Sequence, residues 1–285
     1  MLTLVTGIEG FTGRFVQAEL EANGHTVVGL NSDLTDADAI ANEVLDLQPE
    51  AVIHLAGLAF VGENNANAFY DVNLIGTRNL LDALAKHALK LSNVLVTSSA
   101  NVYGNSTGGM LDESVKPNPS NDYAVSKLAM EYMTRLWSKK LSFCIVRPFN
   151  YTGVGQDGRF LIPKIVRHFR DKEAVIELGN LDVWREFGDV RTVATIYRML
   201  IENCPVAETL NVCTGQTYSL KEVIALCEKL TGHKIEIKVN PEFVRENEVR
   251  ELKGDNSRLR KLVDNFDLYT FEETLSWMLR DPNEI

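Results

Sequence analysis

The sequence is poor in the residues that build disulfide frameworks and metal sites, and it has no long apolar run. Only four of its 285 residues are cysteines, Cys144, Cys204, Cys213 and Cys227, and no two of them have the paired C-x-x-C spacing. We therefore expect reduced thiols in a cytoplasmic protein, and no metal site. The start passes directly into an apolar stretch without a basic leader, so we expect neither a signal peptide nor a membrane span.

Positive charge is also scarce. The chain has 29 Lys and Arg residues against 39 Asp and Glu residues, which gives a formal net charge of −10. We therefore expect neither nucleic acid nor an anionic membrane as a partner. A small anionic ligand is compatible with this balance, because a few local arginines can bind phosphate. The length allows one large domain or two unequal ones.

A glycine-rich turn lies between an expected strand and an expected helix at the start of the chain. The apolar Leu2–Thr6 stretch is followed by GIEGFTG, with glycines at Gly7, Gly10 and Gly13. Such glycines allow a tight turn and close approach of the backbone to a pyrophosphate, which the helix N-terminus then faces. The pattern predicts a dinucleotide site, and the alternative is a turn that binds nothing.

The end of the second expected strand bears on which dinucleotide binds. An acidic residue there bonds the ribose 2′-hydroxyl, and an arginine binds a 2′-phosphate. The chain has Asn31 and Ser32, which are neither, so NAD and NADP are both compatible. Asp33 is predicted to contact the adenine or the ribose, or else to be the N-cap of the next helix.

The third expected strand, 51–56, ends in small residues that let the backbone run close to a dinucleotide. Within it, His54 is predicted to be a packed strand residue rather than a catalyst. A helix is expected from Asp71 to His87, with Asn73 buried and tying strands together.

A serine-rich strand end and a later helix supply the candidate chemistry. The stretch 94–99 is a strand that ends in Thr97, Ser98 and Ser99, and a loop leads from it to Tyr123 and Lys127. Residues four apart share one face of a helix. A neighbouring ammonium lowers the pKa of a phenol from about 10, which suits an acid–base group near neutral pH. The alternative is a Tyr-x-x-x-Lys spacing that occurs by chance.

Together these features resemble the extended short-chain dehydrogenase/reductases, a family that modifies nucleotide-linked sugars. The markers are the glycine turn, His54-Leu55-Ala56, the SSANVYG stretch 98–104, the Tyr123/Lys127 pair and the RPFN stretch 147–150. The resemblance implies an α/β fold, a Rossmann-type doubly wound parallel sheet with a smaller C-terminal α/β substrate domain. One departure is expected, since the family's usual third strand has no counterpart after Asn31 and Ser32.

The resemblance also implies a division of the chain and a set of cofactor contacts. The dinucleotide-binding domain is expected over 1–152, joined by the returning segment 187–213, and the substrate-binding domain over 153–186 and 214–285. The cofactor is NAD or NADP. The implied contacts are Gly7, Gly10, Phe11, Thr12, Gly13, Asn31, Asp33, Leu34, Leu55, Ala56, Gly57, Asn73, Thr97, Tyr123, Lys127 and Arg147.

The catalytic roles are likewise implied by the resemblance. Ser99, four residues before the tyrosine of the VYG segment, bonds the reacting sugar oxygen, and Tyr123 exchanges a proton with it. Lys127 bonds the nicotinamide ribose and keeps the tyrosine acidic. The family's 4,6-dehydratases have a titrating pair where this chain has Ala100 and Asn101, which argues against water elimination.

Substrate contacts are expected from both halves of the chain. The stretch 178–187 (LGNLDVWREF) resembles a segment of the GDP-mannose-dehydratase and GDP-4-keto-6-deoxymannose-reductase branch, and 243–249 resembles another. Arg185 and Arg245 are then phosphate or nucleotide contacts, although surface charge is the usual fate of arginine. The implied substrate-binding residues are Ser99, Ala100, Asn101, Asn150, Arg185, Arg245 and Glu248.

Two reactions are compatible with this set of residues. The first is NAD(P)H-dependent reduction, at C4, of a nucleotide-linked 4-keto-6-deoxyhexose, with a GDP-sugar favoured. The alternative is a nucleotide-sugar 4-epimerase with tightly bound NAD, which the lack of an acid at Asn31 disfavours. A non-catalytic dinucleotide sensor is a third reading, which the intact catalytic set argues against. The resemblance also implies a homodimer, formed by the helices 73–87 and 123–136.

Overall fold

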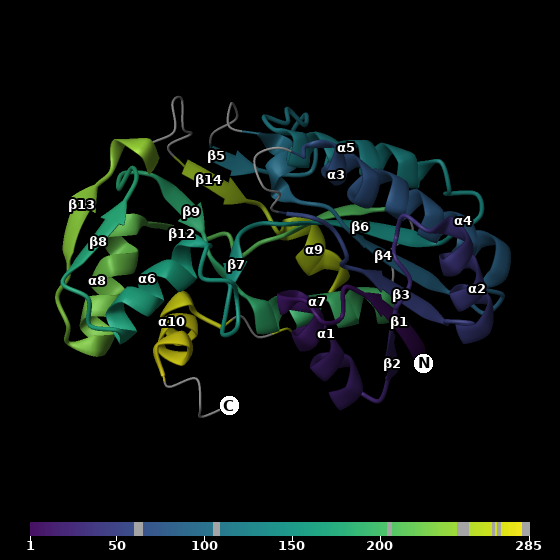
Figure 1. The fold of residues 1–285 in the computed structure, drawn as a ribbon, viewed down its shortest axis with the longest axis horizontal. Coiled ribbons are helices and arrows are strands. Elements are labelled where there is room, and N and C mark those ends of the chain that lie inside the picture. Colours follow the sequence, from purple (N-terminus) through teal and green to yellow (C-terminus); the bar gives the residue numbers. More distant parts are fainter. Residues whose placement is uncertain are drawn as a thin grey trace.

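The computed structural model describes residues 1–59, 65–104, 109–203, 207–243, 251–263, 266 and 269–280. Its largest sheet has six strands in the order β11-β6-β4-β3-β1-β2, and every neighbouring pair is parallel (Figure 1). The strands are β1 (Leu2–Thr6), β2 (Thr26–Gly29), β3 (Ala51–His54), β4 (Asn93–Thr97), β6 (Phe143–Pro148) and β11 (Thr209–Val212). The expected Rossmann-type parallel sheet is confirmed.

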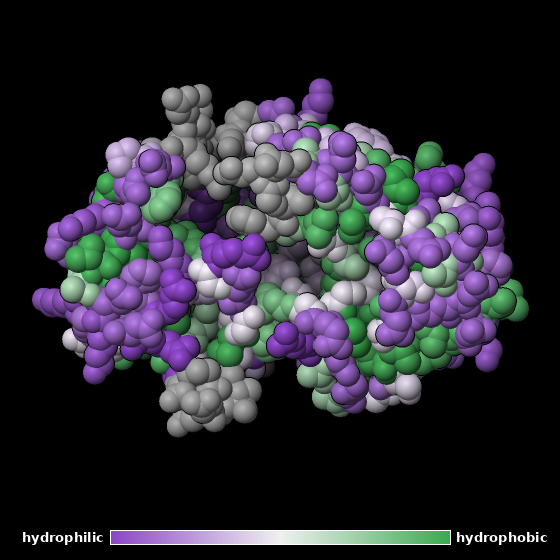
Figure 2. Space-filling model, in the orientation of Figure 1, coloured by the Kyte–Doolittle hydropathy of each residue, from purple (hydrophilic) through white to green (hydrophobic). Residues whose placement is uncertain are grey.

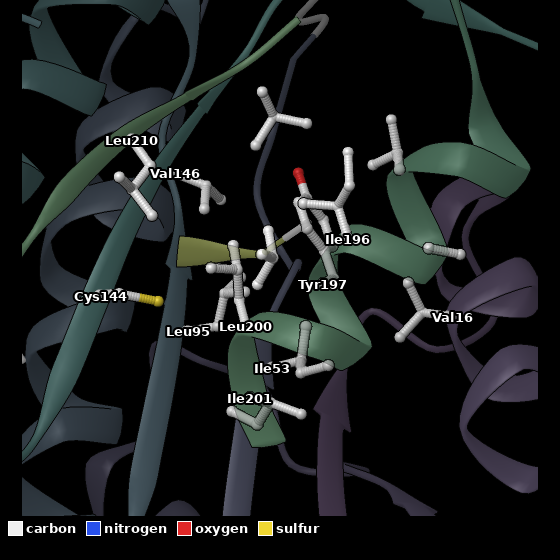
Figure 3. Packing of buried hydrophobic residues seen from close by; sticks show 14 of the residues in the cluster. Val16, Ile53, Leu95, Cys144, Val146, Ile196, Tyr197, Leu200, Ile201 and Leu210 are labelled. Carbon is white, nitrogen blue, oxygen red and sulfur yellow. The ribbon is translucent and has the colours of Figure 1, made fainter. Parts of the chain in front are cut away.

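Helices cover both faces of this sheet, because successive strand residues point to opposite sides. On β1, for example, Leu4 and Val5 belong to two separate buried clusters. One face packs against α1 (Phe11–Ala22) and α7 (Val190–Glu202); the other packs against α2 (Ala37–Leu47), α4 (Thr77–His87) and α5 (Asp122–Arg135). Figure 3 shows Tyr197 of α7 near Ile53 and Leu95 in the first cluster.

The missing strand is confirmed at the β2 edge. β2 lies at the end of the sheet, and the chain continues from it to α2 without a further strand. The N-cap of α2 is Asp36, whose side chain accepts the N–H of Ala39 at 3.0 Å. Asp33 instead accepts the N–H and hydroxyl of Thr35 at 2.8 and 2.7 Å. The N-cap alternative for Asp33 is therefore wrong.

Two other local predictions need correction. The helix expected to begin at Asp71 begins earlier, with α3 (Asn67–Phe69), and passes through the π-helical segment η1 (Tyr70–Gly76) into α4. The loop expected between Ser99 and Tyr123 contains β5 (Gly109–Leu111), which pairs with β14. Three residues carry too little periodicity to indicate a strand, and only the pairing partner defines it.

The second half of the chain builds smaller sheets beside the large one. A four-stranded sheet has the order β12-β9-β14-β5, and β13-β8 and β10-β7 form two-stranded sheets. Their strands are β7 (Tyr151–Thr152), β8 (Val175–Leu178), β9 (Trp184–Glu186), β10 (Gly188–Asp189), β12 (Thr217–Ser219), β13 (Glu236–Val239) and β14 (Glu251–Gly254). The helical segments are η2 (Ala100–Tyr103), α6 (Leu161–Arg170), α8 (Leu220–Thr231), η3 (Pro241–Phe243), α9 (Ser257–Leu262) and α10 (Phe271–Leu279).

This second part has its own core, in which α6, α8 and α10 pack together with β8. Figure 2 shows the surface hollowed between this part and the part that carries α2 and α4. The carboxyl ends of the parallel strands meet at one edge of the large sheet, which is where ligands of such sheets bind. Within the described ranges, no helix is long and apolar enough to cross a membrane.

Candidate active site

Three residues that the sequence predicts to be catalytic meet at the carboxyl end of β4. Ser99 follows that strand, and its hydroxyl hydrogen bonds with that of Tyr123 from the first turn of α5. Lys127, one turn further along α5, donates from Nζ to the carbonyl oxygen of Thr97 at 3.0 Å. Ser99 and Lys127 are 8% and 5% exposed, so both polar groups are removed from bulk water.

Helix caps set this geometry locally. Asn121 is the N-cap of α5, and its side chain accepts the N–H of Ala124 at 2.9 Å. Ser99 is the N-cap of η2 and accepts the N–H of Asn101 at 3.2 Å. A polar N-cap side chain satisfies one of the free N–H groups of a helix and so fixes where the helix begins. Both caps therefore fix where Ser99 and Tyr123 lie relative to each other.

Burial, rather than the ammonium, dominates the acidity of the tyrosine. The pKa of Tyr123 is raised by burial, which the hydrogen bond from Ser99 only partly offsets. The pKa of Lys127 is lowered to about 8 by burial, with the charge of Glu131 acting in the opposite direction. The prediction that the pKa of Tyr123 is lowered is wrong for this structure, because desolvation of the phenolate raises it.

Arg147, predicted to contact the cofactor, is hydrogen bonded to buried side chains of the protein. Its guanidinium donates to both carboxylate oxygens of Glu131, at 2.8 and 2.6 Å, and to the hydroxyl of Tyr103 at 3.0 Å. Ser98 donates to the same carboxylate at 2.6 Å. All of these groups are buried. These contacts hold α5 against β6 and the end of β4, and the cofactor contact of Arg147 stays a prediction.

His54 is a packed strand residue, as the sequence predicts. Its ring nitrogens hydrogen bond the hydroxyls of Thr6 and Thr77 at 2.7 and 2.8 Å. Burial, helped by the charge of Lys127, lowers the pKa of His54 to about 3. The ring is therefore neutral near pH 7 and has no free nitrogen for proton transfer.

Asn73 is fully buried and has three partners in the protein. Its carboxamide accepts the N–H of Leu58 at 2.8 Å, and donates to the carbonyl of Leu58 and the hydroxyl of Ser126, both at 3.1 Å. A Cβ on Gly57 would lie 2.9 Å from the Asn73 oxygen and 3.0 Å from Lys127 Nζ. Asn73 thus ties the segment after β3 to α5, close to the lysine.

The glycine turn has the shape that a dinucleotide requires. Gly7 has φ +70°, which L side chains rarely adopt, and a Cβ on Gly13 would overlap the carbonyl oxygens of Gly7 and Ile8. The first turn of α1 has no side-chain cap, because its N-cap is Gly10. Its free N–H groups can therefore bind an anion. Of the small residues predicted beside the turn, Ala56 packs directly against Gly7.

Phe11 and Thr12 contact a residue that the sequence did not single out. The hydroxyls of Thr12 and Tyr151 are 2.8 Å apart, and the rings of Phe11 and Tyr151 stack with centroids 6.2 Å apart. These contacts join the glycine turn to the segment after β6. The RPFN motif marks where that segment starts, but no pattern shows which side chain turns toward the glycines.

The sequence has no acidic residue directly at the end of β2. The structure brings the carboxylate of Glu43, on α2, to this strand end. Glu43 accepts from the N–H and the side-chain amide of Asn31 at 2.8 and 3.0 Å. It also accepts from the N–H and hydroxyl of Ser32, at 2.8 and 2.5 Å. Leu34, a predicted cofactor contact, is 7% exposed and packs in the core.

The predicted substrate residues are spread over several elements. Asn150 and Asn101 are exposed, while Ala100 packs partly buried beside Tyr103. Arg185 on β9 donates to the carbonyl of Trp184 at 2.8 Å. The predicted contacts Arg245 and Glu248 lie outside the described residues.

Glu131, Glu43 and Tyr151 are the site residues that the sequence analysis missed. Glu131 had a signal, since it lies four residues after Lys127 on the same helix face. Glu43 had none, because the register of α2 against β2 is a tertiary property.

Residues 3–213, more than half of the chain, match the NAD dependent epimerase/dehydratase family. The chain is 38% identical to the GDP-6-deoxy-D-talose 4-dehydrogenase of Aggregatibacter actinomycetemcomitans, over 93% of this chain and 92% of the relative. It is 35% identical to the GDP-6-deoxy-D-mannose reductase of Pseudomonas aeruginosa, over 97% and 95%.

Two solved structures are similar to the chain over nearly its whole length. A Burkholderia cenocepacia J2315 protein, provisionally described as an epimerase, is 46% identical with a TM-score of 0.93, over 97% of this chain and 96% of that one. The RMD protein of Pseudomonas aeruginosa, solved in complex with NADPH, is 32% identical with a TM-score of 0.87, over 98% and 97%.

Proposed function

The chain belongs to the NAD dependent epimerase/dehydratase family, and we propose that it reduces a GDP-linked 4-keto-6-deoxyhexose at C4 with NADH or NADPH. The observation that carries this proposal is the pair of curated relatives, each more than 30% identical over more than nine-tenths of the chain. Both are named for oxidation or reduction of a GDP-linked 6-deoxyhexose. The cluster of Ser99, Tyr123 and Lys127 supports the same chemistry.

The cofactor supplies the hydride when it is bound. Tyr123 donates a proton to the sugar oxygen at C4, and Ser99 bonds that oxygen and orients it. Because burial keeps Tyr123 protonated at neutral pH, it is ready to act as the donor in the reducing direction. Lys127, with a pKa of about 8, carries a charge at pH 7 and stabilises the phenolate once the proton has left.

The two parts of the chain divide the binding. The glycine turn, the uncapped start of α1 and the small residues Ala56 and Gly57 bind the dinucleotide, in residues 1–152 with the returning segment 187–213. Residues 153–186 and 214–285 bind the nucleotide-linked sugar, through Arg185, Arg245 and Glu248 together with Asn101 and Asn150.

The test is a reductase assay with purified protein. With GDP-4-keto-6-deoxymannose as substrate, the absorbance of NADH or NADPH is expected to fall in proportion to product formed. A panel of ketosugars linked to GDP, UDP and dTDP then ranks the bases. No oxidation of either cofactor with any nucleotide-linked ketosugar would contradict the proposal.

A nucleotide-sugar 4-epimerase is the second candidate. It is favoured by the 46% identical Burkholderia cenocepacia protein and by Glu43, which supplies an acid at the β2 end where Asn31 has none. An epimerase retains its cofactor through the cycle. Protein that purifies with about one NAD per chain and interconverts 4-epimers without consuming cofactor would replace the first proposal with this one.

We propose a cytoplasmic homodimer, and the exposed face of α5 supports its dimer interface. Val125, Tyr132 and Leu136 recur on one side of the helix and its end, and they are 38%, 62% and 82% exposed. α5 packs beside α4, so that the two helices offer a joint surface (Figure 1). Met130, on the same helix, is fully buried in the core and takes no part in this face. Light scattering is expected to give twice the mass of one chain for the wild type. For the Tyr132→Glu variant it is expected to give the mass of a single chain.

A further inference from the structure

The end of β2 is built around a single carboxylate. Glu43, from the middle of α2, accepts two hydrogen bonds from Asn31 and two from Ser32, at distances from 2.5 to 3.0 Å. These four donors are both N–H groups and both side chains of the residues that follow the strand. Asn31 is exposed, so the cluster faces solvent.

This cluster lies beside the glycine turn. β2 pairs with β1, whose carboxyl end leads into Gly7. Ile8 of the turn is so close to the strand end that a Cβ on Gly29 would lie 2.7 Å from its Cγ2. In dinucleotide-binding folds, the residues that follow this strand face the adenosine ribose. Asn31 and Glu43 are therefore placed where the ribose 2′-position is recognised.

Glu43 is ionised at neutral pH. Burial raises its pKa, but the hydrogen bonds from Ser32 and Asn31 together lower it further, and the net pKa is below the ordinary value. Among the ion pairs of the described residues, none joins Glu43 to a lysine or an arginine. The negative charge at the β2 end is thus not neutralised by a paired cation there.

We propose that Glu43 is the residue that determines cofactor specificity, and that it makes the site prefer NAD(H) to NADP(H). A 2′-phosphate would meet a carboxylate of like charge, and the N–H and side-chain donors of Asn31 and Ser32 are already engaged by Glu43. An unphosphorylated 2′-hydroxyl is neutral and meets no such repulsion from the Glu43 carboxylate. The acid that other dinucleotide folds place on the strand itself is supplied here from the following helix.

The inference rests on the dinucleotide site of the proposed function, but its test needs no sugar. Isothermal titration of the purified protein with NAD⁺ and with NADP⁺ gives two dissociation constants. NAD⁺ is expected to bind at least about tenfold more tightly. Raising the salt concentration from about 0.02 M to about 0.5 M is expected to narrow this ratio, because screening weakens the repulsion of the 2′-phosphate.

Glu43→Gln removes the charge and keeps the size of the side chain. Its NADP⁺ affinity is expected to rise roughly tenfold while its NAD⁺ affinity changes little, so that the ratio approaches one. The matched control is Asp46→Asn, which removes the same charge from an exposed position of α2. This control is expected to leave both constants as in the unchanged protein.

Wild-type protein that binds NADP⁺ as tightly as NAD⁺ would overturn the inference and leave the proposed reduction intact. An equal loss of both affinities in Glu43→Gln would also overturn it, because Glu43 would then only support the loop. If Glu43→Gln does not fold, the wild-type ratio of affinities for adenosine 5′-monophosphate and adenosine 2′,5′-bisphosphate decides alone. Binding of neither dinucleotide would overturn the proposed function as well.

Discussion

The carboxyl ends of β4 and β2 hold their polar groups in opposite ways. At β4, inside the sheet, Lys127, Glu131 and Arg147 are each at most 5% exposed, and each has a hydrogen-bond partner in the protein: Lys127 donates to the carbonyl of Thr97, and Arg147 donates to Glu131. At β2, on the edge of the sheet, Asn31 is exposed and one carboxylate, that of Glu43, accepts every bond of the cluster.

The difference follows from position in the sheet. A buried charge is costly unless it is paired, so the centre requires a complete network, and that network fixes the geometry of the proton donor. The exposed edge has no such requirement, and a single charge is enough to discriminate between ligands. We infer that the site at the carboxyl end of β4 determines the reaction. The site at the carboxyl end of β2 determines which cofactor takes part.

The largest effect is expected from removing the proton donor at the central end. Tyr123→Phe keeps the ring and its packing but loses the hydroxyl that bonds Ser99. Turnover is expected to fall by about 10²–10⁴-fold while the dissociation constant of the cofactor stays within a few-fold. Steady-state kinetics and titration of the same preparation measure both quantities.

The matched control is Tyr132→Phe, on the same helix but with a side chain 62% exposed. It is expected to leave turnover unchanged. If Tyr123→Phe retained normal turnover, the central end would not carry the chemistry and the comparison would fail.

The next largest effect is expected from the buried ion pair between Arg147 and Glu131, which lies one turn of α5 after Lys127. Arg147→Met leaves the buried carboxylate of Glu131 without its partner, which is expected to cost about 3–5 kcal/mol of unfolding free energy. Changing both residues to Met is expected to recover part of this loss. Urea denaturation measures the three free energies.

Lys86→Met is the matched control on the surface. It breaks the ion pair of Lys86 with Asp82, whose side chains are 61% and 40% exposed. Its expected cost is about 0–1 kcal/mol. Equal costs for Arg147→Met and Lys86→Met would contradict the difference that we draw between centre and surface.

The two ends are expected to respond to pH in different ranges, and stability rises with pH in both. The pKa of Lys127 is about 8 when folded and 10.5 when unfolded, so between these values the unfolded chain binds more protons and stability rises with pH. The slope is expected to approach about 1.4 kcal/mol per pH unit and to vanish in Lys127→Met. Glu43 has a lowered pKa, so its contribution is present at neutral pH and is lost as pH falls below 4.5.

Denaturation series from pH 3 to pH 10 on wild type, Lys127→Met and Glu43→Gln separate these contributions. Identical alkaline slopes for wild type and Lys127→Met would show that the lysine is not desolvated. Identical acid slopes for wild type and Glu43→Gln would show that the β2 cluster does not stabilise its carboxylate.

The smallest effect is expected from the helix that positions Glu43. Asp36→Ala removes the N-cap of α2 and is expected to cost about 1 kcal/mol of unfolding free energy. Asp38→Ala, which removes a first-turn acid without a cap bond, is expected to cost less. A loss for Asp38→Ala as large as for Asp36→Ala would mean that charge, rather than the cap bond, holds the start of α2. Thermal denaturation of the two variants makes the comparison.

The site at the carboxyl end of β4 was largely predictable from the sequence. The glycine turn, Ser99, Tyr123 and Lys127 lie on short local motifs, and strand ends of a parallel sheet converge by topology alone. The balance between burial and the ammonium at Tyr123 was not predictable, because desolvation depends on what packs over the phenol. The pairing of Arg147 with Glu131 was not predictable either, because the RPFN motif does not show which side chain faces the arginine.

The cluster at the carboxyl end of β2 was less predictable. The absence of a strand after Asn31 follows from the sequence, and it is confirmed. The sequence shows that Asn31 is not acidic, but it does not show that Glu43, twelve positions later on α2, hydrogen bonds to it. Contacts between elements at that separation depend on how α2 packs, and no motif records it.

The most direct test follows the hydride itself. Reduction of GDP-4-keto-6-deoxymannose with cofactor that carries deuterium at the transferable nicotinamide position gives a product that nuclear magnetic resonance can examine. We predict deuterium at C4 of the hexose, one label for each cofactor oxidised, and none of it when Tyr123→Phe replaces the wild type. A sugar product that forms without deuterium and without loss of cofactor would contradict the proposed reduction.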